Sequence, residues 1–349
     1  MKHHFGDLLD RSFGHWTITP NRDRYRFLLP NAADIPETAT IVVLSADTAN
    51  WERVLDLPKL EELTLHSPSH DQFLALEKLR RLRRLRVTHH RPKSLGVLRG
   101  LWPLEELVLE YVSGLSDLSD LASLPNLRAL HLENLRRVSD FTPLAGCTSL
   151  KYLGLTGTLD WSQPVPDFAF LEHLQALELF WLGSVRYTGP LPALNALARL
   201  PALRKIRVPD HVFPIEEYAR MRVRLRGIEG ADFKPWTVWT DTHAARRLSE
   251  LDMHRLFTKA DWAKWRAAGE HDWGQQPIMT EGGVNVYERD GEVFADDGQR
   301  TYGCCIGKGA RSMSADGKAF AKARAKAEAI FARVELETKA PSKTPDAAR

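Results

Sequence analysis

Leucines recur through the first two thirds of the chain in the pattern Leu-x-x-Leu-x-Leu. The pattern is written at 60–65, 82–87, 104–109, 127–132, 150–155, 174–179 and 203–208, and a degenerate copy at 38–43 places Ile41 and Val43 in register. The second apolar position falls at 41, 63, 85, 107, 130, 153, 177 and 206, in steps of 22, 22, 22, 23, 23, 24 and 29 residues. A repeat of this length holds one strand and a return segment, and it buries its apolar face only by stacking on neighbours. The pattern therefore predicts an α/β solenoid, a right-handed array with a parallel β-sheet on its concave face.

The same patterning predicts how the chain is divided. We expect an N-terminal cap at 1–37, about eight repeats at 38–213, a C-terminal cap of the solenoid at 214–240, a small α+β module at 241–336 and a disordered tail at 337–349. A solenoid exposes apolar surface at both ends, so caps are needed there.

Local signals predict the elements outside the repeats. Helical spacing of apolar residues favours helices at 215–225, 243–257, 260–268 and 319–336. The dipeptide Asp290-Gly291 lies between two strand-like runs, 284–287 and 292–294, and predicts a hairpin turn. A third strand is expected at 300–306, and the aromatic residues of 231–239 are suited to cover the last repeat.

Composition describes an ordinary soluble protein. The chain has 349 residues, of which 43% are hydrophobic and 27% charged, and a formal net charge of +3 at pH 7, which is too small to imply nucleic acid or an anionic membrane. The three cysteines, Cys147, Cys304 and Cys305, offer no disulfide framework. The first sixteen residues contain no signal-peptide apolar region, and no apolar run approaches the roughly 18 residues of a membrane helix. We therefore expect a cytoplasmic protein without a membrane segment.

Function should lie in the positions between the leucines. Alternate strand residues point to opposite faces, so if the leucines fill the core, the intervening residues form an exposed inner face. The candidate partner-binding residues on that face are Glu62, Arg84, Arg86, Glu106, Glu110, His131, Glu133, Tyr152, Glu178, Phe180 and Trp181.

Two features of this face each leave two interpretations open. Glu62, Arg84 and Glu106 are lateral neighbours, and they form either a self-neutralised surface ladder contributing under about 1 kcal/mol per pair or a charge pattern that selects a partner. Aromatic residues gather near the later repeats, where they either anchor a partner or cover irregular repeats; they are Tyr152, Trp161, Phe180, Trp181 and Tyr187.

The stretches Leu115-Ser116-Asp117-Leu118 through Leu127 and Val138-Ser139-Asp140-Phe141 through Leu150 resemble the short leucine-rich repeats of bacterial internalins and of a regulatory subunit of protein phosphatase 1. The resemblance covers about 38–209 and implies a solenoid that recognises proteins. The asparagine that the family places three residues after the last strand leucine is absent here, since those places hold Pro68, His90, Val112, Leu135, Thr158, Leu182 and His211. The ladder that satisfies the turn amides in the family must therefore be replaced by other contacts.

Reactive side chains do not form a recognisable constellation. The histidines lie in different repeats without the spacing of zinc ligands, and the vicinal cysteines are too close for an ordinary disulfide. The run 303–310 has three residues between its glycines and lacks Ser or Thr after Lys308, so it is not a Walker A loop. We predict no catalysis, no cofactor, no metal site and no small-molecule substrate.

The segment Tyr302-Gly303 with Ile306-Gly307-Lys308-Gly309, followed by a helix, weakly resembles the WGR module of nucleic-acid-associated proteins, although the tryptophan and arginine of that motif are missing. Residues 300–333 carry eight basic and two acidic residues. An alternative function is therefore nucleic-acid binding by this module, through Lys308, Arg311, Lys318, Lys322 and Lys326.

The favoured hypothesis is a bacterial, non-catalytic scaffold that binds another protein on the concave face of its repeats. An immunity or adaptor role would fit such a scaffold. The alternative keeps the repeats as a support for a nucleic-acid-binding module.

Overall fold

The computed structural model describes residues 29–158, 160–241, 245–247, 279–281, 284–289, 292–296 and 300–339. The chain divides into two compact units: the first comprises Met1–Phe233 with Ile330–Arg349, and the second comprises Lys234–Ala329. In the described residues, no helix is both long and apolar enough to span a bilayer. The helix predicted at 260–268 and residues 340–349 of the expected tail lie outside the described residues.

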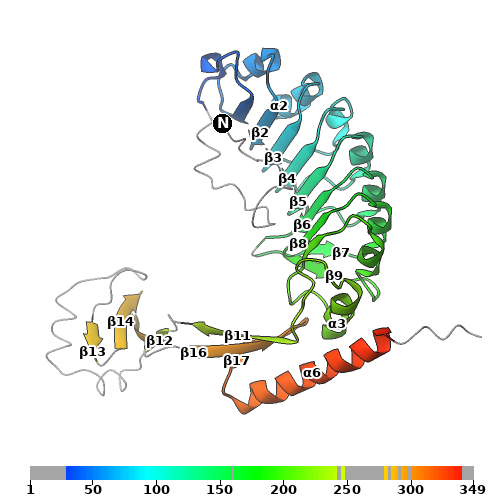
Figure 1. Ribbon diagram of the computed structural model, residues 1–349. Coiled ribbons are helices and arrows are strands. Elements are labelled where there is room, and N and C mark those ends of the chain that lie inside the picture. The colour runs from blue at the N-terminus through cyan, green and yellow to red at the C-terminus, as the bar shows by residue number, and fades with distance from the viewer. Residues whose placement is uncertain are drawn as a thin grey trace, which may run out of the picture. The chain divides into compact units, whose positions relative to one another are not determined.

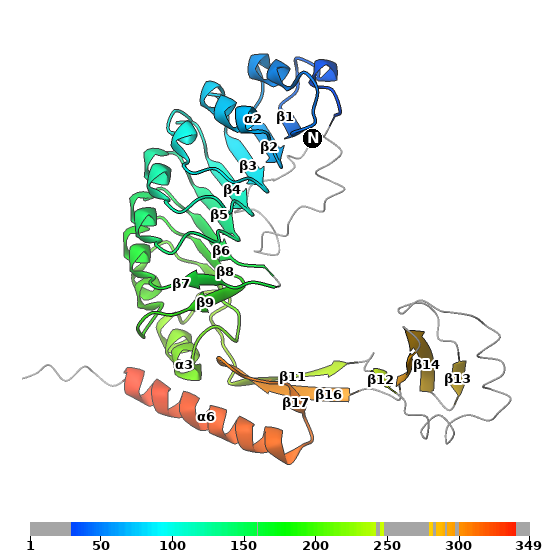
Figure 2. The same ribbon diagram turned by 180° about the vertical axis from the view of Figure 1, so that it is seen from behind.

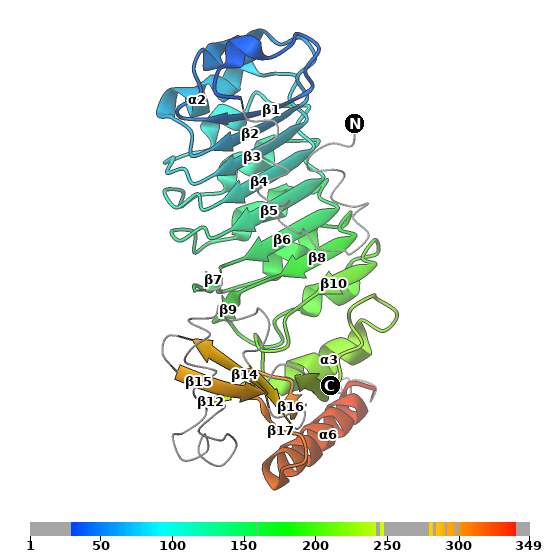
Figure 3. The ribbon, with the colours of Figure 1, turned by 90° about the vertical axis from the view of Figure 1, so that its left-hand side faces the viewer.

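The first unit is built on one parallel sheet of eight strands, seen edge-on in Figure 1 and facing the viewer in Figure 3. In order, the strands are β1 (Ile41–Ser45), β2 (Glu62–His66), β3 (Arg84–Thr88), β4 (Glu106–Glu110), β5 (Ala129–Glu133), β6 (Tyr152–Thr156), β8 (Leu179–Leu182) and β10 (Lys205–Arg207). Each repeat adds one strand, so the predicted solenoid is confirmed.

The sheet register corrects the sequence alignment of two repeats. Leu63 is paired with Val42 and not with Ile41, so the first copy is displaced by one residue. Leu153 is paired with Phe180, which makes 177–182 the seventh copy and not 174–179. The core position therefore runs through 42, 63, 85, 107, 130, 153, 180 and 206, in steps of 21, 22, 22, 23, 23, 27 and 26 residues.

The strands end in a recurrent left-handed turn. Ser67, His89, Tyr111 and Asn134 follow four consecutive strands and all have positive φ, between 46° and 57°. Each of them donates its backbone N–H to a carbonyl of the next strand, over 2.9–3.0 Å. This extra hydrogen bond compensates the uncommon backbone conformation and fixes the direction in which the chain leaves the sheet.

Short helical turns return the chain along the outer side of the sheet, as Figure 2 shows from behind. They are η1 (Ala32–Asp34), η2 (Trp51–Asp56), α2 (His70–Leu74), η3 (Ala75–Lys78), η4 (Gly96–Leu98), η5 (Ser119–Ser123), η6 (Thr142–Gly146), η7 (Ala169–His173) and η8 (Asn195–Arg199). The longer sixth and seventh repeats also pair β7 (Gln163–Val165) with β9 (Val185–Tyr187) in a small parallel sheet. Leucines of the strands and turns fill the core between the two layers.

Individual buried side chains replace the missing asparagine ladder. The Gln163 amide accepts a hydrogen bond from the Leu135 N–H and donates to the Val138 carbonyl, both over 3.1 Å. A carboxylate oxygen of Glu217 accepts from the N–H groups of Ala193 and Leu194 at 2.7 and 3.2 Å. Because buried amides need partners, these isolated side chains do for single turns what a repeated residue does in a regular array.

The helix predicted at 215–225 is confirmed as α3 (Ile215–Arg224). The alanine-rich helix predicted at 319–336 is α6 (Lys318–Lys339), whose residues from Ile330 on belong to the first unit. There Arg222 of α3 lies over the Phe331 ring, 4.6 Å from its centroid, and pairs with Glu335.

The second unit contains two antiparallel sheets. One comprises β11 (Trp236–Asp241), β16 (Arg300–Cys305) and β17 (Met313–Ser314); the other comprises β12 (Ala245–Arg247), β15 (Glu292–Asp296), β14 (Val284–Arg289) and β13 (Met279–Glu281). The predicted hairpin and third strand are confirmed. The helix predicted at 243–257 is wrong at 245–247, because these residues pair with β15 as a strand. Trp236 and Trp239 lie in β11, paired with β16.

Candidate inner-face interface

The inner face comprises the side chains of β2 to β10 that point away from the leucine core. The register places them in three columns: Glu62, Arg84, Glu106, Ala129, Tyr152, Leu179 and Lys205; Thr64, Arg86, Val108, His131, Gly154, Trp181 and Arg207; and His66, Thr88, Glu110, Glu133 and Thr156. Along each strand, the inner-face residues alternate with core residues, and neighbouring strands lie about 4.8 Å apart.

Two predicted inner-face residues are not there. Phe180 is a core residue with 0% exposure, since the corrected register turns it toward the leucines. Glu178 precedes β8 and lies one position before the inner face. Both errors have one cause: leucines at 171, 174, 177, 179 and 182 allow two overlapping copies of the motif, and the prediction rests on the earlier copy.

The remaining predicted residues are on the inner face, but the expectation that they are exposed is wrong. Trp181 is partly buried, and the others are fully buried, with exposures between 0% for Arg86 and 8% for Arg84; they are Glu62, Arg84, Arg86, Glu106, Glu110, His131, Glu133 and Tyr152. Strand alternation predicts the direction of each side chain, but its burial also depends on lateral packing. Long side chains on closely spaced strands lie against their neighbours, and here they do so through ion pairs and ring contacts.

The charged half of the inner face is an internal network. The Arg86 guanidinium donates to both oxygens of Glu110 on the neighbouring strand, with Nε–Oε2 at 2.9 Å and Nη2–Oε1 at 2.6 Å. The predicted pairing of Arg84 with Glu106 is confirmed, with Nε–Oε1 at 3.4 Å. These are buried pairs and not a solvated surface ladder, so removing one partner is costly.

The other half of the inner face is apolar. Val108, Ala129, Tyr152 and Leu179 form a buried cluster, and Trp181 is packed against its edge. The His131 ring lies 5.1 Å from the Trp181 ring, and its Nδ1 is 3.3 Å from the Tyr152 hydroxyl.

The aromatic residues that the sequence grouped together are in fact divided. Tyr152 and Trp181 are on the inner face. Tyr187 stacks in the core on Phe168, with ring centroids 5.4 Å apart, and Phe168 also contacts Phe180. Trp161 lies in a loop against the Arg136 guanidinium. The covering role is therefore confirmed for Tyr187 and Phe180, whereas a partner-anchoring role for Tyr152 and Trp181 stays a prediction.

Beside the inner face runs a charge ladder that the sequence analysis missed. The residues immediately before β3 to β6, β8 and β10 pair laterally: Glu105 binds Arg83 at 2.6 Å and Arg128 at 3.1 Å, and Glu178 binds Lys151 at 3.1 Å and Arg204 at 2.9 Å. The hydrogen bond to Glu105 raises the pKa of Arg83. The signal was available, since this position follows the first leucine of each copy and is charged in all seven, with both signs present.

The most accessible side chains of the inner face lie at its C-terminal end. Trp181 is partly buried, Lys205 is half-buried and Arg207 is exposed. The Arg207 guanidinium lies 5.6 Å from the Trp181 ring centroid, a cation–π contact. A tryptophan held between a histidine and an arginine, beside an apolar cluster, has the composition of interface hot spots.

The five basic residues predicted to bind nucleic acid in the alternative function lie in the second unit and are exposed. None of them has a salt bridge with a described residue; they are Lys308, Arg311, Lys318, Lys322 and Lys326. Three of them recur at every fourth position of α6 and so share one side of that helix. They form a basic stripe available to an anion.

His90, in the turn after β3, is expected to make the fold pH-sensitive. Burial lowers its pKa, the nearby His70 lowers it further, and its ring is 4.6 Å from the Phe73 ring. Because the folded-state pKa lies below that of the unfolded chain, the unfolded state binds more protons, and stability falls as the pH decreases from about 6.5.

In urea unfolding at pH 8 and pH 5, His90→Phe should therefore lose less stability on acidification than the wild type. His173→Phe, at an exposed histidine on η7, controls for the added ring. An unchanged pH dependence in the His90 variant would contradict the assignment.

In the described residues, no three His, Cys, Asp or Glu side chains gather as a set of metal ligands. Burial raises the pKa of the Cys147 thiol to about 11. It also raises the pKa of Cys305, with a smaller contribution from Cys304.

No protein-family model matches the chain, and no curated protein is significantly similar to it. Among solved structures, an internalin (InlF) of Listeria monocytogenes is 22% identical, with 52% of this chain and 58% of that chain covered and a TM-score of 0.42. Internalin C2 of the same species is 20% identical, with 60% and 86% covered and a TM-score of 0.35. Drosophila Toll, in its complex with Spatzle, is 16% identical, with 50% and 24% covered and a TM-score of 0.40. The leucine pattern and the eight-stranded parallel sheet together make the first unit a leucine-rich-repeat solenoid.

Proposed function

We propose that this chain is a non-catalytic scaffold whose leucine-rich repeats bind a protein partner at the C-terminal end of the inner face. The observation that carries the proposal is the setting of Trp181, which lies between His131 and Arg207 at the edge of a buried apolar cluster. Tryptophan and arginine beside a desolvated apolar surface supply much of the binding energy in typical interfaces.

In this proposal, the charged half of the inner face supports the binding surface and does not contact the partner. Arg86 and Glu110 are buried and bind one another across neighbouring strands, so they would hold the sheet surface rigid and would not themselves serve as contact residues. The partner would contact Trp181 and Arg207, and only at these accessible positions would a substitution affect binding without unfolding the repeats. This restricts the predicted partner-binding set to its C-terminal members.

The test is capture from cells of the source organism followed by binding measurements with the captured protein in purified form. Trp181→Ala and Arg207→Glu should each weaken binding by about tenfold or more, since hot-spot truncations cost about 2 kcal/mol. Arg199→Glu, which reverses an exposed charge on η8, is the matched control and should leave binding unchanged. Equal affinities for wild type and both inner-face variants would refute the proposal.

A second candidate function rests on the basic stripe of the second unit. The five exposed cations there would hold a nucleic-acid backbone by counterion release, giving affinity that falls steeply with salt. In the full chain, Lys318→Glu with Lys322→Glu should abolish a mobility shift of duplex DNA or RNA at low salt. Absence of any shift by the wild-type chain would remove this candidate.

A further inference from the structure

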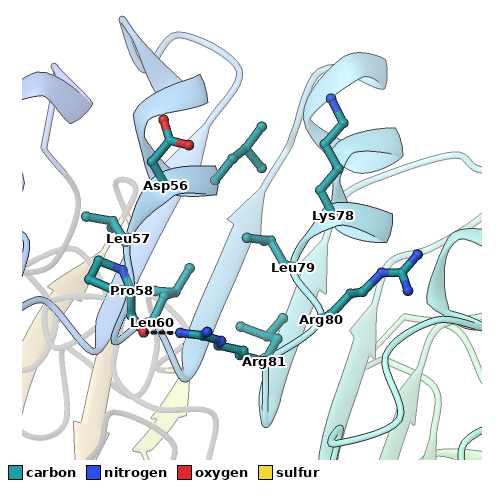
Figure 4. A pocket seen from close by; sticks show the side chains of 10 residues that line it. Asp56, Leu57, Pro58, Leu60, Lys78, Leu79, Arg80 and Arg81 are labelled. Atoms are coloured by element: carbon teal, nitrogen blue, oxygen red, sulfur yellow. Dashed lines mark hydrogen bonds between the residues drawn. The ribbon is translucent and has the colours of Figure 1, made fainter.

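A half-open cavity of about 320 Å³ lies between the turns that precede β2 and β3 (Figure 4). Its floor is aliphatic and largely buried, made by Leu57, Leu60, Leu79 and Leu82. Its rim is charged, with Asp56, Lys78, Arg80 and Arg81. This size is at the lower end of ligand pockets and is sufficient for one aliphatic side chain.

The backbone around this cavity is fixed by contacts between repeats. The Arg81 guanidinium donates to the Pro58 carbonyl over 3.2 Å, as the dashed line in Figure 4 shows. In the next repeat, the Asn126 side chain donates to the Trp102 carbonyl over 2.8 Å. The cavity is therefore a defined feature of the solenoid edge.

An exposed tryptophan lies beside it. In the sheet register, Arg84 of β3 lies opposite Glu106 of β4. Arg80 and Trp102, each four residues earlier, therefore occupy equivalent places in adjacent repeats. Trp102 is 68% exposed, the highest value among the aromatic side chains described. A large aromatic side chain next to arginines is typical of interface cores and not of an ordinary surface.

Several cations at this edge form no salt bridge with the residues that the structure describes. Arg83, Arg99 and Arg128 nearby all form salt bridges. In contrast, no salt bridge joins the following edge residues to any described residue: Lys59, Lys78, Arg80 and Arg81. Together with Trp102 these four residues make up the edge patch, whose positive charge is available to a partner.

We propose that the edge patch is a second docking site, for an acidic polypeptide segment with an aliphatic side chain between its carboxylates. The aliphatic side chain would enter the leucine-floored cavity, and the flanking carboxylates would pair with Arg80 and Arg81. Trp102 would cover the segment from the side of the next repeat. Guanidinium groups suit carboxylates because they bind them with two parallel hydrogen bonds.

The chemistry favours a polypeptide over a nucleic acid. The cavity is lined largely by leucines, which suit an aliphatic side chain better than a polar base. The Asp56 carboxylate at its rim repels a continuous phosphate chain. The patch spans three turns, about 10 Å, which matches a short peptide segment and not a long phosphate track.

The test uses the full chain and a fluorescein-labelled probe peptide of eight glutamates around a central leucine, measured by fluorescence anisotropy. Wild type should bind saturably, and Arg80→Glu with Arg81→Glu should weaken binding by about tenfold or more. The matched control reverses two adjacent exposed arginines elsewhere, Arg136→Glu with Arg137→Glu, and should change the affinity less than about twofold.

Two further probes decide the class of ligand. A peptide with serine in place of the leucine should bind several-fold more weakly, because it leaves the cavity unfilled. An oligothymidylate of equal charge should compete poorly. Equal weakening by both double variants, no preference for leucine, or tighter binding of the oligothymidylate would each overturn the proposal, without affecting the test of Trp181 and Arg207.

Discussion

Replacing Phe180 by alanine should lower the free energy of unfolding by about 3–5 kcal/mol, as expected for a large cavity in a packed core. The side chain has 0% exposure and pairs laterally with Leu153 and Ile206 along the leucine row. Its ring also contacts Phe168 edge-on, with centroids 6.0 Å apart. Urea unfolding followed by far-ultraviolet circular dichroism measures the loss.

The neighbouring residue provides the control. Trp181 is the next residue in β8 and points to the opposite face of the sheet, so Trp181→Ala removes an even larger ring, but at a partly buried position. It should cost about 1 kcal/mol or less, while the partner affinity proposed above should fall. If Trp181→Ala destabilised the fold more than Phe180→Ala, the register assigned to β8 would be wrong.

A second large loss is expected at the buried ion pair. Arg86→Met removes the guanidinium that binds both oxygens of Glu110, and the fold should lose about 3–5 kcal/mol. Arg86 has 0% and Glu110 4% exposure, so solvent cannot take over the role of the missing partner. Chemical denaturation at neutral pH again provides the measurement.

The double variant Arg86→Met with Glu110→Leu should recover most of that loss, because a well-packed apolar pair of similar volume avoids burying a lone charge. The two single changes are in direct contact, so their effects should not add. Additive losses in the double variant would indicate that the two side chains act independently.

The repeats were predictable where their length is nearly constant. Steps of 22 and 23 residues from Leu63 to Leu153 leave one consistent alignment, and the register agrees with it. Around Leu177 the leucines are spaced at three residues and then two, so both alignments satisfy the pattern. Only the hydrogen bonds between strands choose between them, and these depend on the longer return segment.

The burial of the inner-face side chains could not be predicted from the repeat pattern. Alternation tells which face a side chain points to, but burial depends on what its lateral neighbours do. Arg86 reaches diagonally to Glu110, a contact that joins two different columns. By contrast, the lateral salt bridges of Glu105 and Glu178 could have been predicted from the sequence, because all their members share one position in the motif.

The spacing between the strands of the parallel sheet limits which residues of an extended partner can contact equivalent positions of successive repeats. Strands recur about every 4.8 Å, whereas an extended polypeptide advances about 3.4 Å per residue. For a peptide laid across the strands, residues and strands therefore come back into alignment only after about seven residues and five strand spacings, which cover the same length. Recognition along such an array is discontinuous, and a few well-separated contact points determine which segments fit.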